Sequence, residues 1–116
     1  MLPRQHRLSR DRDIQRVWKH GRGVSHDQIQ LRVLAAVGGV SQLTVIVPLK
    51  LSKRATVRNR VKRQLRAIVA KLLPAFTRPV CGLVFVHAGY RARPFAELEV
   101  LVRSLCIRAR MLPPLS

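Results

Sequence analysis

The sequence predicts a compact α+β domain over residues 1–116, with a small mixed or antiparallel sheet of about four strands and three helices. Three observations predict it. Apolar and polar residues alternate between positions 24 and 47, as in half-buried strands. A long amphipathic stretch runs from 55 to 73, and an unbroken apolar run occupies 80–87. The expected order is therefore helix, strand, strand, a possible short strand, helix, strand, helix.

Composition fits one domain and indicates an anionic partner. The chain has 116 residues, and hydrophobic residues make up 47% of it, which is enough for a single core. Lys and Arg number 23 against five acidic residues, for a formal net charge of +18. Such a charge bears on partners and solubility rather than on fold. No acidic residue lies between Asp27 and Glu97, so the middle of the chain is uniformly cationic.

The N-terminal part predicts an arm followed by a short helix. Residues 1–8 are basic, and we expect a loosely held N-terminal arm there. Ser9 is suited to cap a helix over about 10–20. The apolar stripe of that helix is Ile14, Val17 and Trp18. Trp18, the single Trp, is either a packing residue or a surface on which a base or ribose stacks.

The next segment alternates with a period of two. We expect a half-buried strand over 24–37, a turn at Gly38-Gly39, and a second strand through 43–47. These two strands should pair as an antiparallel hairpin. Arg32 would then lie on the face away from the buried side chains. Residues 49–55 form a basic connector in which a short third strand is possible.

The helix expected over 55–73 has two distinct faces at about 100° per residue. One face is apolar and carries Val57, Val61, Leu65, Ile68 and Leu72. The other is cationic around Asn59 and carries Arg58, Arg60, Lys62, Arg63 and Arg66. Like charges four residues apart, such as Arg58 and Lys62, destabilise an isolated helix by about a few tenths of a kcal/mol per pair. A solvated face normally mixes both signs, so the uniform sign favours binding to a nucleic acid.

The last third of the chain predicts one strand and one helix. Residues 80–87 (VCGLVFVH) are typical of a central strand covered on both faces, which would complete a β-α-β unit. The last helix should begin near Pro94. Its inner positions are Phe95, Leu98, Leu101, Val102, Leu105 and Cys106. We expect residues 111–116 to form a frayed tail.

Residues suited to catalysis are few. The carboxylates and the four His are scattered, and Cys81 and Cys106 lack the spacing of a zinc site. There is no phosphate-binding glycine loop and no nucleophile elbow. We therefore expect no catalytic side chain and no protein-bound metal or cofactor. The sequence has neither a secretory signal nor an apolar run of about 18 residues, so we expect a cytoplasmic protein without membrane attachment and with reduced thiols.

One sequence motif indicates a particular protein family more specifically than composition or charge does. The run Arg58-Asn59-Arg60-Val61-Lys62-Arg63-x-x-Arg66 resembles the signature of the bacterial ribonuclease P protein subunit. Lys50 and Ala55 upstream fit the same pattern. The run Asp13-Ile14-x-x-Val17-Trp18-x-x-Gly21 is similar to the first helix of that family and its following glycine. The resemblance covers about residues 8–107.

The resemblance implies a function. The family supplies the protein partner of a catalytic RNA, and the holoenzyme removes the 5′ leader from precursor tRNA. The RNA would hold the active site and its Mg²⁺ ions, and we expect no obligate protein partner. The implied contacts with the RNA are Lys50, Lys53, Arg54, Arg58, Asn59, Arg60, Lys62, Arg63 and Arg66. The implied cleft for the leader lies between the first helix and the sheet and is lined by Ile14, Trp18 and Arg32. The family fold also implies a left-handed β-α-β crossover, against the usual right-handed form.

Three departures and three alternatives accompany this interpretation. The approach to the basic helix is Pro48-Leu49-Lys50-Leu51-Ser52-Lys53 where the family has Val-Ser-Lys-Lys-x-Gly, so one Lys and the Gly are lost. Ile14 stands where the family typically has Phe, and Arg32 stands where an aromatic residue is common. A structural RNA-binding protein, similar to a ribosomal protein, would bind RNA without affecting tRNA processing. A DNA-binding regulator would place the basic helix in a major groove, but strands rather than a helix are expected before it. A stand-alone nuclease would need clustered carboxylates, which the sequence lacks.

Overall fold

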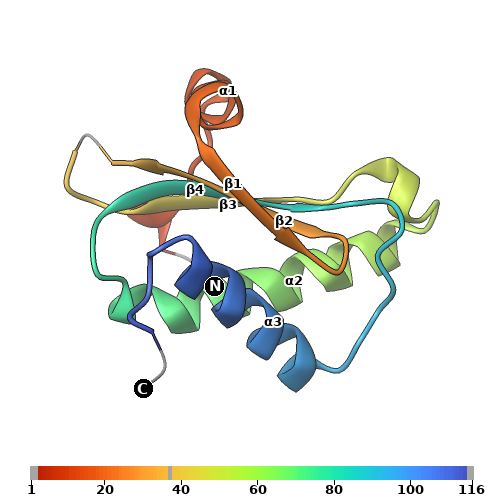
Figure 1. The fold of residues 1–116 in the computed structure, drawn as a ribbon. Helices are drawn as coiled ribbons and strands as arrows, with labels where there is room; N and C mark the ends of the chain where they lie inside the picture. Colours follow the sequence, from red (N-terminus) through yellow and green to blue (C-terminus); the bar gives the residue numbers. More distant parts are fainter. Residues whose placement is uncertain (1–2, 37, 115–116) are drawn as a thin grey trace.

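The structure is a computed structural model that describes residues 3–36 and 38–114. One helix lies on one face of a four-stranded mixed sheet, and two helices lie on the other (Figure 1). The helices are α1 (Asp11–His20), α2 (Ala55–Leu72) and α3 (Phe95–Arg108). The strands are β1 (Arg22–His26), β2 (Ile29–Ala35), β3 (Gln42–Ile46) and β4 (Val80–Val86). The short 3-10 turns are η1 (Arg4–His6), η2 (Leu49–Leu51) and η3 (Leu73–Ala75). The predicted α+β class is confirmed.

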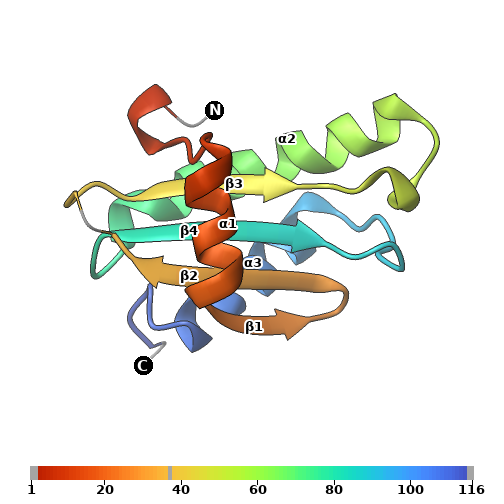
Figure 2. The same ribbon diagram turned by 90° about the horizontal axis from the view of Figure 1, so that it is seen from above.

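The strand order is β1-β2-β4-β3 (Figure 2). β4 pairs antiparallel with β2 on one side and parallel with β3 on the other. The prediction that residues 24–37 and 43–47 pair as a hairpin is therefore wrong, because β4 lies between them. Both faces of β4 are covered by helices, so this apolar strand is placed in the interior of the sheet, as predicted.

The predicted strand over 24–37 is in fact two strands. β1 and β2 form a hairpin whose two-residue turn is Asp27 and Gln28, with φ of 48° and 69°. Positive φ at both turn residues matches the twist of the flanking strands, and Asn-Gly or Asp-Gly is the usual sequence for it. Gln is uncommon in this conformation, so the sequence carries no turn signal here. The possible strand at 49–55 is also wrong, because this connector contains the turn η2 and then begins α2.

The main core lies between the sheet and the pair α2 and α3. The apolar stripe of α2 is buried as predicted at Val61, Leu65, Ile68 and Leu72, and Val69 joins it. The stripe of α3 is buried at Leu98, Leu101, Val102, Leu105 and Cys106. Val57 and Phe95 are exceptions, with 37% and 40% of their surface exposed. Both lie in the first turn of their helices, before the packed region begins.

The N-terminal segment is held against the sheet rather than loosely attached. The backbone N–H of Leu8 donates to the carbonyl of Leu43 at 2.9 Å, and the Leu8 side chain is buried. The His6 ring donates to the carbonyl of Ser41 at 2.7 Å. Ser9 does not cap α1, because the residue before the helix is Arg10 and no side chain bonds there. Residues 1–2 lie outside the described part of the predicted arm.

The predicted frayed tail is also partly wrong. Met111 and Leu112 are buried in the main core. The Met111 carbonyl accepts the backbone N–H of Thr77 at 2.9 Å, which joins this segment to the loop before β4. Residues 115–116 lie outside the described range.

The connection from β3 through α2 to β4 is left-handed, as the resemblance implied. Figure 2 views the sheet from the α1 side, with β3 and β4 pointing in the same direction and α2 behind them. Seen from the α2 side with both strands pointing up, β4 lies to the left of β3, whereas nearly all such crossovers place it to the right. This arrangement sets α2 beneath the β3 side of the sheet, with one long face open to solvent.

Candidate nucleic-acid interface

The open face of α2 carries most of the predicted contacts. Four of the six side chains that the RNR-like run contributes are exposed, and the other two are half-buried. The exposed ones are Asn59, Arg60, Arg63 and Arg66, and the half-buried ones are Arg58 and Lys62. None of the described ion pairs involves these side chains, whereas Lys71 further along α2 pairs with Glu99 at 2.8 Å. The cationic charge of this face is therefore not neutralised by any acidic side chain among the residues that the structure describes.

The N-terminal end of α2 adds further positive charge. Lys50, Lys53 and Arg54 precede the helix and are exposed. The first turn has no acidic residue and no side-chain cap, so its free N–H groups and the positive end of the helix dipole add to the charge of these side chains. Arg58 donates through Nη1 to the Ser52 carbonyl at 2.6 Å, and this bond ties the approach segment to the helix.

The residues predicted to line the leader cleft lie where α1 crosses the sheet. Leu83, in the middle of β4, is buried beneath α1 together with Val17. Figure 2 shows α1 lying across the strands of the sheet. Ile14 and Trp18 both pack against this smaller core, so α1 is fixed on the sheet.

Arg32 and Trp18, which were both predicted to line the leader cleft, are in contact with each other. The Arg32 guanidinium carbon lies 5.6 Å from the centroid of the Trp18 ring, a cation–π arrangement. Arg32 Nη2 donates to the Gly21 carbonyl at 2.7 Å. Arg32 Nε is buried and has no hydrogen-bond partner in the described structure. The Arg32 guanidinium therefore lies over the Trp18 ring, at the position where the resembling family commonly has an aromatic ring.

Two further aromatic residues beside Trp18 were not predicted from the sequence. Phe85 meets Trp18 edge to face at a centroid distance of 5.4 Å, and His87 meets Phe85 in the same way at 4.9 Å. The pairing register places Ser25, Gln30 and Ile46 in one row with Phe85 across the sheet. Phe85 lay in an unbroken apolar run and was assigned to a doubly buried strand. Phe85 lies two residues before His87, and alternate residues of a strand share a face. This spacing was the available signal that Phe85 and the polar His87 lie on the same face of the sheet.

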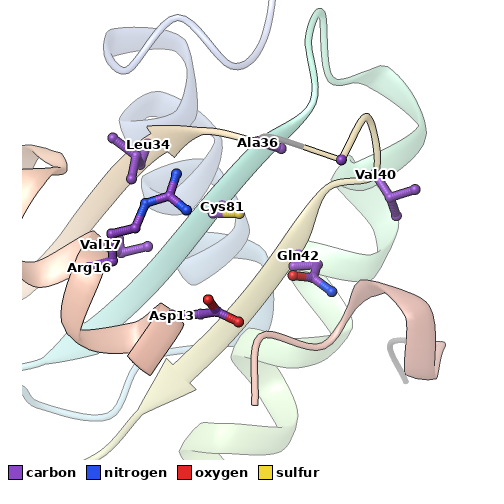
Figure 3. A pocket seen from close by; sticks show the side chains of 9 residues that line it. Asp13, Arg16, Val17, Leu34, Ala36, Val40, Gln42 and Cys81 are labelled. Carbon is purple, nitrogen blue, oxygen red and sulfur yellow. The ribbon is translucent and has the colours of Figure 1, made fainter. Parts of the chain in front are cut away.

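A pocket of about 200 Å³ lies between α1 and the sheet, near the start of β4 (Figure 3). It is lined by Asp13 and Arg16 from the helix and by Leu34, Gln42 and Cys81 from the strands. Burial raises the pKa of the Cys81 thiol above its usual value of 9.0, with the nearby Arg16 acting in the opposite direction. Burial also raises the pKa of Cys106, in the main core, to about 12. Both thiols are free in the structure and are neutral near pH 7.

The described residues do not assemble a metal centre. Within 3–36 and 38–114, no three His, Cys, Asp or Glu side chains come together in a group that could hold a metal ion. No helix in the same part of the chain is both long and apolar enough to cross a membrane.

The fold and these surfaces define a class: a small α+β protein with a cationic helix on one face of its sheet and an aromatic cluster on the other, as in RNA-binding proteins. Comparisons with known proteins agree with this class. The family model described as ribonuclease P matches residues 2–110. The chain belongs to the ribonuclease P protein family, the protein component of the endoribonuclease that matures the 5′ end of tRNA. Its partner is therefore ribonuclease P RNA, and the alternatives of a ribosomal-type protein, a DNA-binding regulator and a stand-alone nuclease are not supported.

The relatives cover nearly the whole chain. The "Ribonuclease P protein component" of Microcystis aeruginosa is 34% identical over 115 residues, which is 96% of this chain and 96% of the relative. The protein of the same description from Pseudanabaena is 39% identical over 113 residues, or 97% of each chain.

Solved structures share the fold at lower identity. The ribonuclease P protein of Staphylococcus aureus superposes with a TM-score of 0.82 at 19% identity, covering 92% of this chain and 97% of that one. The protein of Thermotoga maritima gives 0.77 at 21% identity, covering 88% and 96%.

Proposed function

We propose that this chain binds the catalytic RNA through the open face of α2, binds the 5′ leader of precursor tRNA in the cleft beneath α1, and thereby assists RNA-catalysed removal of that leader. The observation that carries the proposal is the long face of α2, whose cations have no acidic partner in the described structure. A folded protein gains little from such a face on its own, because like charges repel along the helix.

Several features favour structured RNA on α2. Paired A-form RNA presents its backbone and shape more than readable base edges, which suits a rigid row of cations. The proposed contacts extend from Lys50, Lys53 and Arg54 along the helix to Arg66. Each phosphate that they neutralise releases bound counterions, so binding should weaken steeply as salt rises.

Other features favour a single strand in the cleft. Unpaired bases stack on aromatic rings and on Arg guanidinium planes. The cleft offers Trp18, Phe85 and His87 in edge-to-face contact, with the Arg32 plane against Trp18. Ile14 supports this surface through its packing rather than as a stacking partner. The departures from the family pattern therefore replace aromatic stacking by stacking on Arg32.

We assign the chemistry and its Mg²⁺ ions to the RNA. In two-metal sites carboxylates hold the ions, and the described part of this chain brings no such group together. The side chains of this protein bind and orient both RNAs. We expect it to act in the cytoplasm, where precursor tRNA is processed.

The cleft is tested by substituting Trp18 in the holoenzyme. Trp18→Leu keeps apolar packing under α1 but removes the aromatic face. Phe95→Leu is the matched control, because Phe95 is a half-exposed ring on the opposite side of the sheet. Loss of one base-stacking contact should weaken precursor tRNA binding about tenfold or more and leave mature tRNA unchanged. Equal losses for both tRNAs would limit Trp18 to packing.

A further inference from the structure

A groove of about 570 Å³ runs along the outer edge of β3, beside the proposed leader cleft. Its walls come from the N-terminal segment, the start of α1, β3 and the middle of α2. Arg7 lines one side, and Arg63 and Arg66 line the other. Ile14 and Ala67 contribute apolar surface. The groove therefore adjoins both proposed RNA sites and was not expected from the sequence.

The backbone of β3 contributes to this groove. The N-terminal segment meets the edge of β3 only at its start, where Arg7 bridges to Leu43 and Leu8 bonds to the Leu43 carbonyl. The chain then leaves the edge to form α1. Alternate residues of a strand direct their N–H and C=O groups to the same side, so those of Val45 face outward as the Leu43 carbonyl does. Among the described residues, no strand pairs with this part of the edge.

The charges around the groove have one sign. Arg63 and Arg66 are exposed and lie three residues apart on α2, which makes them neighbours on one face. Arg7 is exposed on the facing N-terminal segment. No acidic residue lines the groove. Guanidinium groups in such an arrangement suit a phosphate, which they bind through paired hydrogen bonds.

We propose that this groove binds one unpaired nucleotide of the catalytic RNA. The base would lie against Ile14 and Ala67, its polar edge would meet the backbone of Val45, and its phosphate would lie among the arginines. The proposal rests on the RNA-binding function proposed above and adds a single-stranded contact to the paired RNA on α2. A peptide strand added to the β3 edge is less favoured, because it would not by itself neutralise Arg63 and Arg66, which take part in none of the described ion pairs.

The test fills the groove without changing its charge. Ala67→Phe places a ring in the groove from an exposed helix position, and Ala67→Leu serves if the Phe variant does not fold. Ala75→Phe is the matched control, because Ala75 is exposed beyond the end of α2 and does not line the groove. Each protein is bound to ribonuclease P RNA, and the reactivity of every ribose 2′-hydroxyl to an acylating reagent is compared with the affinity at several salt concentrations.

Wild type and Ala75→Phe should protect a small set of unpaired nucleotides that Ala67→Phe leaves reactive. The affinity of Ala67→Phe should fall about tenfold, as for one lost base contact, with an unchanged salt slope. If Ala67→Phe retains both the protection and the affinity, the groove does not hold a nucleotide, and the RNA-binding function stands. If wild type itself fails to bind the RNA, the proposed function fails first, and the groove proposal fails with it.

Discussion

Removing two cations from the middle of α2 should change the salt dependence of RNA binding by a calculable amount. Arg60 and Arg63 are exposed, three residues apart, and take part in none of the described ion pairs. Each lost phosphate contact lowers the slope of log K against log salt by about 0.7 to 0.9. Arg60→Ala with Arg63→Ala should therefore flatten the slope by about 1.4 to 1.8.

This change of slope predicts a measurable difference between wild type and the double variant in how much RNA affinity is lost when salt is raised. Between 50 and 200 mM salt, wild type should lose about tenfold more affinity than the double variant. The fold should not suffer, because the substitutions relieve repulsion between neighbouring cations and Ala favours helix. The assay is filter binding of labelled ribonuclease P RNA at four or more salt concentrations, with thermal unfolding monitored in parallel.

The control removes the same charge elsewhere. Arg22→Ala with Arg91→Ala takes two exposed arginines from the β1 edge and from the loop before α3. This variant should retain the wild-type slope. If the Arg60 and Arg63 variant has the wild-type slope, or if both double variants flatten it equally, the open face of α2 is not the site of phosphate contact.

Two further predictions concern the core. Leu65→Ala should lower the free energy of unfolding by about 2 to 5 kcal/mol in urea titrations, because Leu65 is fully buried. Val57→Ala, at a partly exposed position of the same helix, should lower it by under about 1 kcal/mol. Similar losses for the two variants would mean that the packed face of α2 is misassigned. Cys106 has a pKa of about 12 in the folded protein against 9.0 for an unburied thiol, so the unfolded state loses its proton first and stability should fall as pH rises from about 9 to 12. Cys106→Ala should remove this part of the pH dependence. Rapid reaction of the Cys106 thiol with a disulfide reagent in the native protein at pH 8 would contradict its burial.

The local pattern of apolar residues was sufficient to predict the elements whose position is decided by burial alone. The stripe of Leu65 and Ile68 and the apolar run beginning at Val80 predicted a core-facing helix and an interior strand, because burial alone decides both. The charged face around Asn59 was equally readable, since uniform sign along a helix has no structural purpose of its own.

Long-range pairing could not be read in the same way. Nearness in the chain favoured pairing the strands on either side of Gly38-Gly39, but β4 competes for the central place and its partners are chosen by burial on both faces. The Asp27 and Gln28 turn depends on the twist of the hairpin rather than on the residues usual there. The handedness of the crossover leaves no mark in hydrophobic periodicity.

The cluster of side chains around Trp18 was predicted only in part, because its contacts also depend on how distant elements pack. Trp18 and Arg32 were identified, but their contact depends on where α1 crosses the sheet. Phe85 and His87 were missed, because an unbroken apolar run does not show which of its faces remains partly open. Met111 and Leu112 were assigned to a frayed tail although they complete the core, since burial of a chain end depends on which elements surround it.

The most direct test of the account is reconstitution of cleavage. The purified chain is mixed with a bacterial ribonuclease P RNA and a precursor tRNA at a low, near-physiological Mg²⁺ concentration at which the RNA alone is slow. The account predicts accurate and faster removal of the 5′ leader, with no cleavage by the protein without the RNA. Tight binding to the RNA with an unchanged cleavage rate would contradict it and would indicate a purely structural RNA-binding role.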